Sequence, residues 1–286
     1  MKNNSAGQNT VASAGSTFRD HYITNGFAFP VSVLNPADAI SMRRELETAE
    51  ALVGEGTEKC TLLRAYPQML MPSFHNVLFN PTIVEAGQAL LGLDLLVWGA
   101  SIFIKEPHSD KIISWHQDLT YWGLDDSEEV TCWLALSDAT AVSGCMQFVA
   151  GSHKNLIQPH HDTFADNNLL SRGQELRVNV DPAEATDIVL STGQASFHHG
   201  HLFHASGPNN SDDRRIGVAI RLIKPSMKQR GSEKLTVTQI AGTDNFDHFT
   251  HGYPPRGFLH EADFHDARAE RDLRNTIMFA GAAKGS

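Results

Sequence analysis

The sequence predicts a mainly β protein, a double-sheet jelly roll (double-stranded β-helix) with flanking helices. Helical patterns come first along the chain, and a series of short strands separated by turn residues follows them. The chain has 286 residues, of which 41% are hydrophobic and 20% charged, as in an ordinary globular protein with a large core.

Two helices are predicted from their start and stop signals. The pairs Asn35-Pro36 and Asn80-Pro81 each place an N-cap residue before a proline that suits the first helical turn. Apolar residues then recur at helical spacing, and Gly54 and Gly92 stand where the helices would end. We therefore expect helices that begin at 36 and 81 and end at these glycines.

The strands follow from short apolar or alternating runs bounded by turn residues, at 95–105, 130–138, 145–149, 187–190, 195–199 and 215–224. We expect a flexible tail over 1–15 and one domain over 16–286. That domain would have a helical part at 16–94, the jelly-roll core at 95–225 and a C-terminal extension at 226–286. Its Gly-, Pro- and aromatic-rich stretch 242–258 suits a mobile lid or a surface loop.

Charge and cysteine content narrow the partners and the compartment. A net charge of −10 without a dense Lys/Arg run argues against nucleic-acid or membrane binding and favours a small-molecule substrate. Three scattered cysteines suggest reduced thiols. Neither a signal-peptide pattern nor a C-terminal peroxisomal tripeptide is present, so we expect a cytoplasmic protein, and no pattern indicates its oligomeric state.

The stretch SWHQDLTYW, residues 114–122, contains an H-x-D pair, His116 and Asp118. Residues i and i+2 of a strand point the same way, but many solvated strand faces carry such pairs, so the motif is weak evidence by itself. An iron oxygenase site needs two imidazoles and one carboxylate. Four histidines lie between 195 and 215, and His204 is the strongest candidate because it closes an apolar run before a turn. The other three, which suit surface or supporting positions, are His198, His199 and His201.

A strand with two different faces begins at residue 215. One face is predicted to be apolar, and the other carries Arg215, Gly217, Ala219 and Arg221. An arginine on a face of small residues is available to bind a carboxylate in a bidentate manner. Arg214 competes for this role, but it is equally well explained as a solvated turn charge beside two aspartates.

Together these motifs resemble the phytanoyl-CoA dioxygenase family of Fe(II)/2-oxoglutarate oxygenases. The resemblance rests on H-x-D at His116 and Asp118, on H-x-S-x-x-N from His204 to Asn209, and on Arg215. The stretch SGCMQFVAGSHK, residues 143–154, is also similar to a turn of that family, and the resemblance covers about 95–224.

The resemblance implies a role for each matched residue. His116, Asp118 and His204 would hold Fe(II), and Arg215 with the Ser206 hydroxyl would bind the distal carboxylate of 2-oxoglutarate. Trp133 would wall the cofactor cavity. With O₂ as the second co-substrate, the family's usual reaction hydroxylates a C–H bond and releases succinate and CO₂. Related halogenases have a small residue in place of Asp118, so halogenation is not expected, while desaturation, epimerisation and ring closure stay open.

The substrate is predicted only by class. We expect a small polar metabolite, with aminoalkylphosphonates such as 2-aminoethylphosphonate as one candidate, and natural-product tailoring or acyl-CoA hydroxylation as alternatives. Residues beside the H-x-D motif that could face the substrate, or equally be solvated or buried in the core, are Lys105, Gln117, Tyr121 and Trp122. Cations that could anchor an anionic substrate, or be solvated or paired with acids, are Lys105, Arg64 and Arg221.

Two other classes of function fit part of this pattern. A non-catalytic metal-binding jelly-roll module would keep the three metal ligands but would not need a carboxylate clamp such as Arg215. A zinc hydrolase is the weaker alternative, because no residue near the motif resembles a placed general base with its own orienting partner.

Overall fold

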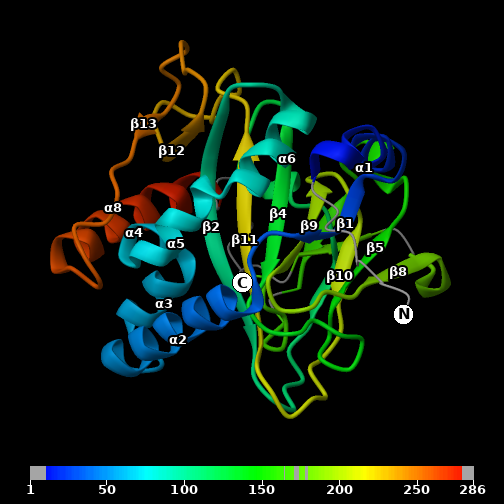
Figure 1. The fold of residues 1–286 in the computed structure, drawn as a ribbon, viewed down its shortest axis with the longest axis horizontal. Helices are drawn as coiled ribbons and strands as arrows, with labels where there is room; N and C mark the ends of the chain where they lie inside the picture. Colours follow the sequence, from blue (N-terminus) through cyan, green and yellow to red (C-terminus); the bar gives the residue numbers. More distant parts are fainter. Residues whose placement is uncertain (1–10, 164, 171–173, 178–179, 279–286) are drawn as a thin grey trace, which may run out of the picture.

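The computed structural model describes residues 11–163, 165–170, 174–177 and 180–278. Two sheets, antiparallel except at the edge pair β12 and β13, form the body of the protein, which confirms the predicted jelly roll with flanking helices (Figure 1). The larger sheet has the order β1-β9-β4-β11-β2-β12-β13, the smaller has the order β3-β10-β5-β8, and β6 pairs with β7 alone. The strands of the larger sheet are β1 (Phe27–Ser32), β2 (Leu95–Lys105), β4 (Glu129–Ala135), β9 (Gln194–His199), β11 (Arg215–Ile223), β12 (Thr236–Ala241) and β13 (Thr250–His251). Those of the other sheets are β3 (Ile113–His116), β5 (Met146–Val149), β8 (Ala185–Ile188), β10 (His204–Ser206), β6 (His160–Asp162) and β7 (Gln174–Leu176).

The helices include both that the sequence predicted. Asn35 accepts a hydrogen bond from the Asp38 amide at 2.9 Å and caps α2, and Asn80 accepts one from the Thr82 amide at 2.9 Å and caps α6. Gly54 and Gly92 end these helices with φ of 82° and 105°, values that favour glycine. The helices are α1 (Val11–Asn25), α2 (Pro36–Val53), α3 (Glu58–Ala65), α4 (Pro67–Leu70), α5 (Pro72–Asn76), α6 (Pro81–Leu91), α7 (Leu119–Trp122) and α8 (Glu261–Met278), with 3₁₀ turns at Val77–Phe79, Ser152–Lys154 and Pro182–Glu184.

Five of these helices gather on one side of the larger sheet. Figure 1 shows α2, α3, α4, α5 and α8 beside β2 and β11, with β5, β8 and β10 on the other side. The sequence analysis did not predict α3 to α5, because Pro67 and Pro72 break this stretch into segments too short to show a helical period. It also did not predict β1, which lies in the part expected to be helical and pairs with β9.

Strand β11 has the two faces that its alternation predicts. Ile216, Val218, Ile220 and Leu222 pack in a core shared with the helices. Ala219 belongs to a second core between the sheets, with Trp133 and Phe148. Arg215 and Arg221 share the face of Ala219, so β11 directs both arginines towards the interior of the jelly roll.

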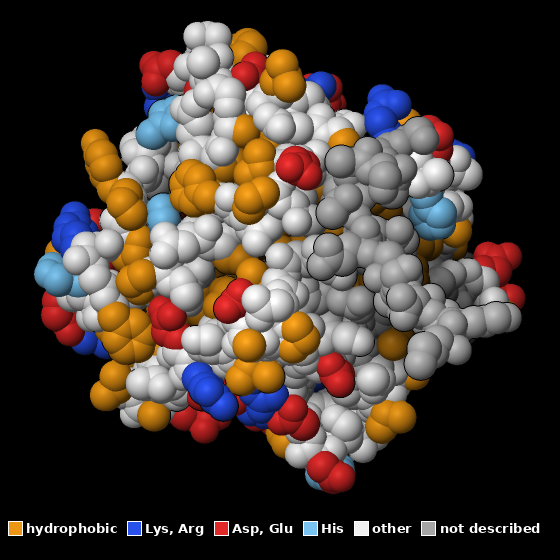
Figure 2. All heavy atoms as spheres, in the orientation of Figure 1, with side chains coloured by type: hydrophobic (Ala, Val, Ile, Leu, Met, Phe, Trp, Pro, Cys, Tyr) orange, Lys and Arg blue, Asp and Glu red, His pale blue; other side chains and the backbone are white. Residues whose placement is uncertain are grey.

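The face of the molecule in Figure 2 carries Lys and Arg in small separate groups, with Asp and Glu close to several of them. Among the described residues, no helix combines the length and the apolar character needed to cross a membrane. The three cysteines are buried and free, as core positions would require.

Candidate active site

The two candidate histidines meet because β3 and β10 are neighbours in the smaller sheet. His116, the last residue of β3, lies opposite His204, the first residue of β10, in the antiparallel register. The H-x-D motif suggested that Asp118 lies on the same strand as His116, but the structure places Asp118 after the end of that strand. It has helical φ and ψ of −61° and −48° at the start of α7, so a turn brings its carboxylate back towards the histidines.

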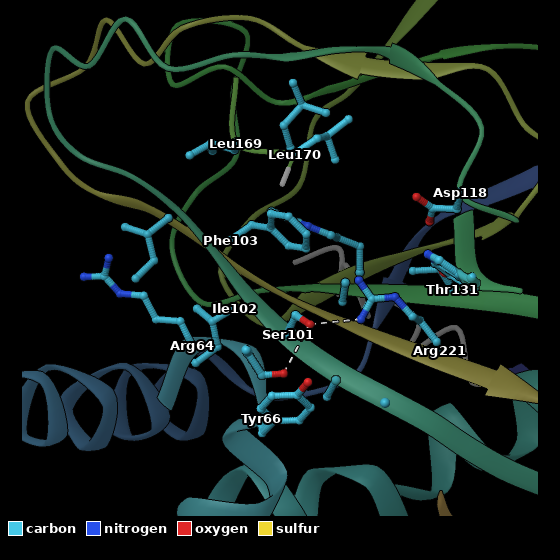
Figure 3. Close-up of a pocket in the computed structure, with 18 of the residues that line it drawn as sticks. Arg64, Tyr66, Ser101, Ile102, Phe103, Asp118, Thr131, Leu169, Leu170 and Arg221 are labelled. Carbon is cyan, nitrogen blue, oxygen red and sulfur yellow. Dashed lines mark hydrogen bonds between the residues drawn. The ribbon is translucent and has the colours of Figure 1, made fainter. Parts of the chain in front are cut away.

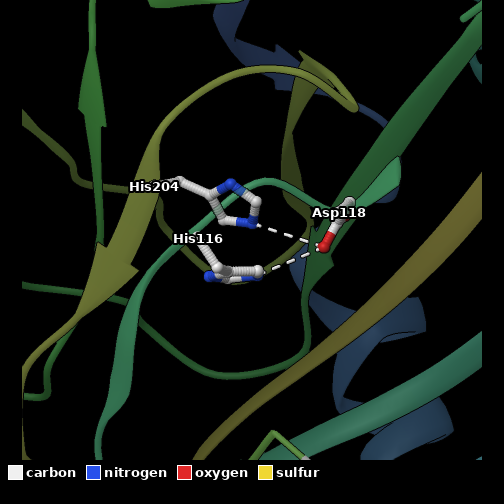
Figure 4. Close-up of side chains that lie close together, drawn as sticks. All are labelled: His116, Asp118 and His204. Carbon is white, nitrogen blue, oxygen red and sulfur yellow. Dashed lines mark hydrogen bonds and ion pairs between the residues drawn. The ribbon is translucent and has the colours of Figure 1, made fainter. Parts of the chain in front are cut away.

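The carboxylate of Asp118 faces both imidazoles (Figure 4). Its Oδ1 lies 3.2 Å from Nε2 of His116 and 3.7 Å from Nε2 of His204. One potential ligand atom from each residue lies within 4.8 Å of the others, a spacing suited to a single metal ion. All three side chains are largely buried, with exposed fractions of 4% for His116, 16% for Asp118 and 7% for His204.

Backbone carbonyls orient both imidazoles. Nδ1 of His116 lies 2.9 Å from the Ser114 carbonyl, and Nδ1 of His204 lies 2.9 Å from the Leu202 carbonyl. A carbonyl only accepts, so each Nδ1 carries the proton and each Nε2 keeps its lone pair for a metal. Burial lowers the pKa of His204 well below its usual value, which keeps this imidazole neutral. Two neutral imidazoles and a carboxylate form the donor set of non-haem Fe(II) oxygenases, so these residues fit that metal.

His198 is the other buried histidine near this group. It lies on β9, and its Nε2 is 4.0 Å from Oδ2 of Asp118. Its Nδ1 is buried and has no hydrogen-bond partner, so it lacks the carbonyl support that His116 and His204 have. His199 and His201 contact each other instead, through a 2.9 Å hydrogen bond from the His201 amide to Nδ1 of His199.

A second cluster of buried polar groups lies around Ser206, near the metal-binding candidates. Arg215 is 1% exposed, and its Nη2 donates to the Ser206 hydroxyl at 3.4 Å. Its Nε has no partner, and among the described residues no carboxylate forms an ion pair with it. Lys105 lies opposite Arg215 on β2, fully buried, and donates to the Ser206 hydroxyl at 2.6 Å and to the carbonyls of Ser206 and Gly207.

Two buried basic groups therefore lie side by side. Burial and the charge of Arg215 lower the pKa of Lys105 to about 6, and burial lowers the pKa of Arg215 to about 10. Buried charges in proteins are normally paired, so a buried guanidinium group without a carboxylate partner, beside an amine that can take up a proton, is suited to binding an anion. The sequence analysis considered Lys105 as a substrate contact, whereas the structure places its ammonium group with Arg215 and Ser206.

Trp133 and Gly217 shape the wall beside Arg215. The guanidinium carbon of Arg215 lies 5.3 Å from the centre of the Trp133 ring. A Cβ atom on residue 217 would overlap the same ring, so Gly217 is what allows the tryptophan to lie against β11. Asn209 is fully buried and donates to the carbonyls of Lys105 at 3.0 Å and Asp213 at 2.8 Å, which fastens the turn before Arg215 to β2.

A cavity of about 690 Å³, a size suited to small-molecule ligands, is lined by the three metal-binding candidates and by Arg215 and Ser206, whereas Lys105 lies behind its wall (Figure 3). It extends beyond the jelly roll to helices that the sequence analysis did not predict, since α3 and α8 contribute Arg64, Arg271 and Arg274. The stretch 242–258, expected as a lid or a loop, contributes no residue to its lining. Apolar lining comes from Phe103, Leu169 and Leu170.

The remaining substrate candidates have different positions. Gln117 lines the cavity, but its amide donates to the His201 carbonyl at 2.9 Å and accepts from the Gln158 amide at 2.8 Å, so it is held by the fold. Trp122 stacks on Trp98 with ring centres 5.1 Å apart and lines the cavity. The side chain of Tyr121 lies outside the part of the structure that is described.

Arg214 is not the solvated turn charge considered above. Only 18% of its side chain is exposed, and it pairs with Glu50 and Glu106 at 2.9 Å each. Arg214 and Arg215 thus point to opposite sides of β11, the first towards helix α2 and the second towards the cavity.

Comparison with known proteins agrees with this geometry. Within curated proteins, the chain is 26% identical over 181 residues to a probable alpha-ketoglutarate-dependent hypophosphite dioxygenase of Stutzerimonas stutzeri, covering 62% of each chain. It is 29% identical over 164 residues to the phytanoyl-CoA dioxygenase domain-containing protein 1 of Mus musculus, covering 54% of this chain and 53% of that protein. The matches thus span between about half and two thirds of these relatives.

Solved structures extend the likeness to most of the chain. The apo structure of ThoJ, a non-heme monooxygenase, superposes with a TM-score of 0.81 at 32% identity, covering 92% of this chain and 99% of that one. CytC3 with Fe(II) and alpha-ketoglutarate shares the fold, with a TM-score of 0.62 at 19% identity, covering 85% of this chain and 95% of that one. The sequence profile of phytanoyl-CoA dioxygenase (PhyH) matches residues 22–217. The chain belongs to the phytanoyl-CoA dioxygenase family.

Proposed function

We propose that this protein is an Fe(II)/2-oxoglutarate-dependent dioxygenase that hydroxylates an unactivated C–H bond of a small polar metabolite. In the balanced reaction, R–H, 2-oxoglutarate and O₂ give R–OH, succinate and CO₂. The observation that carries the proposal is the buried pair of Arg215 and Lys105, which has no carboxylate partner among the described residues and lies beside the His-Asp-His group. A non-catalytic metal module would not need such an anion site.

Each residue of the site then has a specific task. His116, Asp118 and His204 would hold Fe(II), which when bound supplies the redox chemistry that couples O₂ to the oxidation of both substrates. Arg215 would bind the distal carboxylate of 2-oxoglutarate, with Ser206 and Lys105 beside it. Trp133 would hold the cofactor chain against β11, and the apolar side chains of Phe103, Leu169 and Leu170 would limit the entry of water.

Asp118 supports hydroxylation over halogenation. Its carboxylate points at both imidazoles, so it would take the third protein position on the metal. A halide would need that position to be empty.

A phosphonate, which joins a phosphorus oxyanion to a carbon chain with C–H bonds, is a specific candidate for the substrate. The curated relative from Stutzerimonas stutzeri is named for hypophosphite, a phosphorus oxyanion with P–H bonds, and the resemblance to the family suggests small polar compounds such as 2-aminoethylphosphonate. The net charge of −10 does not favour an acyl-CoA, whose nucleotide phosphates would require a basic surface.

A succinate-release screen tests the proposal. Protein loaded with Fe(II) and given 2-oxoglutarate and O₂ is compared with a no-substrate blank, with aminoalkylphosphonates, hypophosphite, amino acids, quaternary amines and acyl-CoAs as candidates. We expect a small polar compound to stimulate succinate release and to gain one oxygen atom, detected by mass spectrometry with isotopically labelled O₂. Stimulation by acyl-CoAs alone would contradict the substrate class, and a protein that neither binds nor consumes 2-oxoglutarate would contradict the reaction.

A further inference from the structure

Strand β11 carries a second arginine on the face that lines the cavity. Arg221 lies on the same side of the strand as Arg215, with the small residues Gly217 and Ala219 between them. Figure 3 shows its guanidinium group in the part of the cavity where Asp118 and Thr131 lie. Arg221 therefore lies at the Asp118 end of this face, and Arg215 lies at the Ser206 end.

The guanidinium group of Arg221 is poorly satisfied. Within the described part of the chain, it donates one hydrogen bond, from Nη1 to the Ser101 hydroxyl at 3.1 Å, and its buried Nε has no partner. Its carbon lies 5.1 Å from the centre of the Trp122 ring, so the aromatic face fixes the side chain without using its N–H groups. Burial lowers the pKa of Arg221, and the negative charges of Asp118 and Glu129 oppose this shift. No carboxylate of the described residues forms an ion pair with it.

The other arginines that line the cavity outside the Ser206 cluster are neutralised by glutamates. Arg64 donates to Glu50 at 2.8 and 2.5 Å. Arg271 pairs with Glu58 at 2.6 Å. Arg274 pairs with Glu270 at 2.7 Å and also donates to the Trp98 carbonyl at 2.6 Å. Among the cavity arginines of the described chain, Arg215 and Arg221 are thus the two without a carboxylate partner.

One ligand does not account for both free arginines. A strand rises about 3.3 Å per residue, so the Cα atoms of Arg215 and Arg221 lie about 20 Å apart. A five-carbon dicarboxylate held at Arg215 therefore leaves Arg221 free for a second anion. The pairing of β11 with β2 places Gly99 opposite Arg221, and the guanidinium group of Arg274, which is paired with Glu270, occupies the space beside this glycine.

We propose that Arg221 binds an anionic group of the primary substrate, a carboxylate, sulfonate or phosphonate, in the same cavity as 2-oxoglutarate. This inference rests on the proposed function and adds the chemical class of the substrate. Arg221 would form charge-assisted hydrogen bonds with the anion through Nε and Nη2, while Nη1 stays on Ser101. Its place beside Asp118 would bring the substrate next to the metal-binding residues.

Calorimetric titration with three small zwitterions, each of which carries one anionic group, tests this assignment. Wild-type protein is loaded anaerobically with Fe(II) and saturating 2-oxoglutarate, so that the Arg215 site is filled. The probes are β-alanine, taurine and 2-aminoethylphosphonate, which share an aminoethyl group, and ethylamine serves as the probe without an anion. We expect at least one of the three anions to bind and ethylamine not to bind.

Variants identify the residue responsible. Arg221→Gln should lower the affinity for the bound probe by about 10- to 100-fold, the range expected when hydrogen bonds to a charged group are lost. Arg221→Lys should give a smaller loss, because it keeps the charge but not the planar fork. Arg64→Gln is the matched control, since this arginine lines the same cavity but is already paired, and it should change the affinity less than about threefold.

A positioning role for Arg221 gives a different result. Fe(II) that is chelated by 2-oxoglutarate shows a metal-to-ligand charge-transfer absorption, which reports the binding of 2-oxoglutarate. If Arg221 only held Asp118 in position, Arg221→Gln would change the affinity for Fe(II) and also the 2-oxoglutarate concentration that half-saturates this absorption. We expect both to stay at wild-type values, which also shows that the variant is folded. Failure of all three anions to bind the loaded wild type, or equal affinities in wild type and Arg221→Gln, would overturn the proposal. A wild type that shows no charge-transfer absorption with 2-oxoglutarate would instead refute the proposed function.

Discussion

Replacing Arg215 by leucine should weaken 2-oxoglutarate binding without unfolding the protein. The lost interactions are hydrogen bonds to a charged group, worth about 1.5–3 kcal/mol, which corresponds to roughly 10- to 150-fold in the dissociation constant. The fold should tolerate the change because Arg215 makes one long hydrogen bond in the protein, 3.4 Å to Ser206, and that hydroxyl keeps its bond to Lys105. Removing a buried cation also relieves its repulsion with Lys105.

Arg214, the neighbouring arginine, provides a control in which stability should change and 2-oxoglutarate binding should not. Arg214→Leu breaks ion pairs with Glu50 and Glu106, so it should lower the free energy of unfolding by about 1 kcal/mol and Tm by a few degrees. It should leave the affinity for 2-oxoglutarate near the wild-type value, because its side chain lies on the helix side of β11.

Two measurements on each variant separate these effects. Anaerobic titration of 2-oxoglutarate into Fe(II)-loaded protein, followed by charge-transfer absorption, gives the dissociation constant, and thermal unfolding gives Tm. We expect Arg215→Leu to change the first quantity and Arg214→Leu the second. The reverse pattern, or equal losses of affinity in both variants, would show that the assigned faces of β11 are wrong.

Two further predictions concern the same cluster. The pKa of Lys105 is about 6 in the free protein, and the carboxylate of 2-oxoglutarate bound beside Arg215 should raise this pKa. Above pH 6 the binding of 2-oxoglutarate should therefore take up protons, and the affinity for 2-oxoglutarate should fall as the pH rises. Calorimetry in buffers of different ionisation enthalpy measures this uptake, which Lys105→Met should abolish; proton release would contradict the reasoning. Gly217→Ala should displace Trp133 and cost about 1–3 kcal/mol of stability. Gly257→Ala, where a Cβ atom meets nothing within 4 Å, should keep the wild-type Tm, and equal Tm values for both variants would argue against the steric explanation.

The elements that the sequence could predict are those with a long repeat or a clear cap. Strand β2 has the predicted bounds Leu95–Lys105, and β11 ends one residue earlier than expected, because nine to eleven alternating or apolar residues give a strong signal. Asn35 and Asn80 cap the two predicted helices for the reason that the sequence suggested. The role of His204 as an iron ligand remains a prediction. Its position opposite His116 in the sheet is the position that this role requires.

Other features depend on contacts that local patterns do not contain. Strands β3 and β10 have four and three residues, too few for any period, although they carry the two histidines. The turn that returns Asp118 to His116 is local but too short to show a period, whereas the approach of His204 to His116 and the pairing of Lys105 with Ser206 join segments far apart in the sequence. Helix α8 was not predicted, yet it closes part of the cavity with Arg274.

The central claim is that His116, Asp118 and His204 hold Fe(II) where 2-oxoglutarate can chelate it. His198 makes the most demanding control, because it is equally buried and also faces Asp118, at 4.0 Å against 3.7 Å for His204. The direct measurement is the anaerobic charge-transfer absorption of the Fe(II) protein with 2-oxoglutarate, together with the iron retained per chain after desalting. We predict that the wild type and His198→Ala give the absorption and retain iron, and that His204→Ala loses both while remaining folded by circular dichroism. Loss in His198→Ala with retention in His204→Ala, or no absorption in the iron-loaded wild type, would contradict the assigned metal centre.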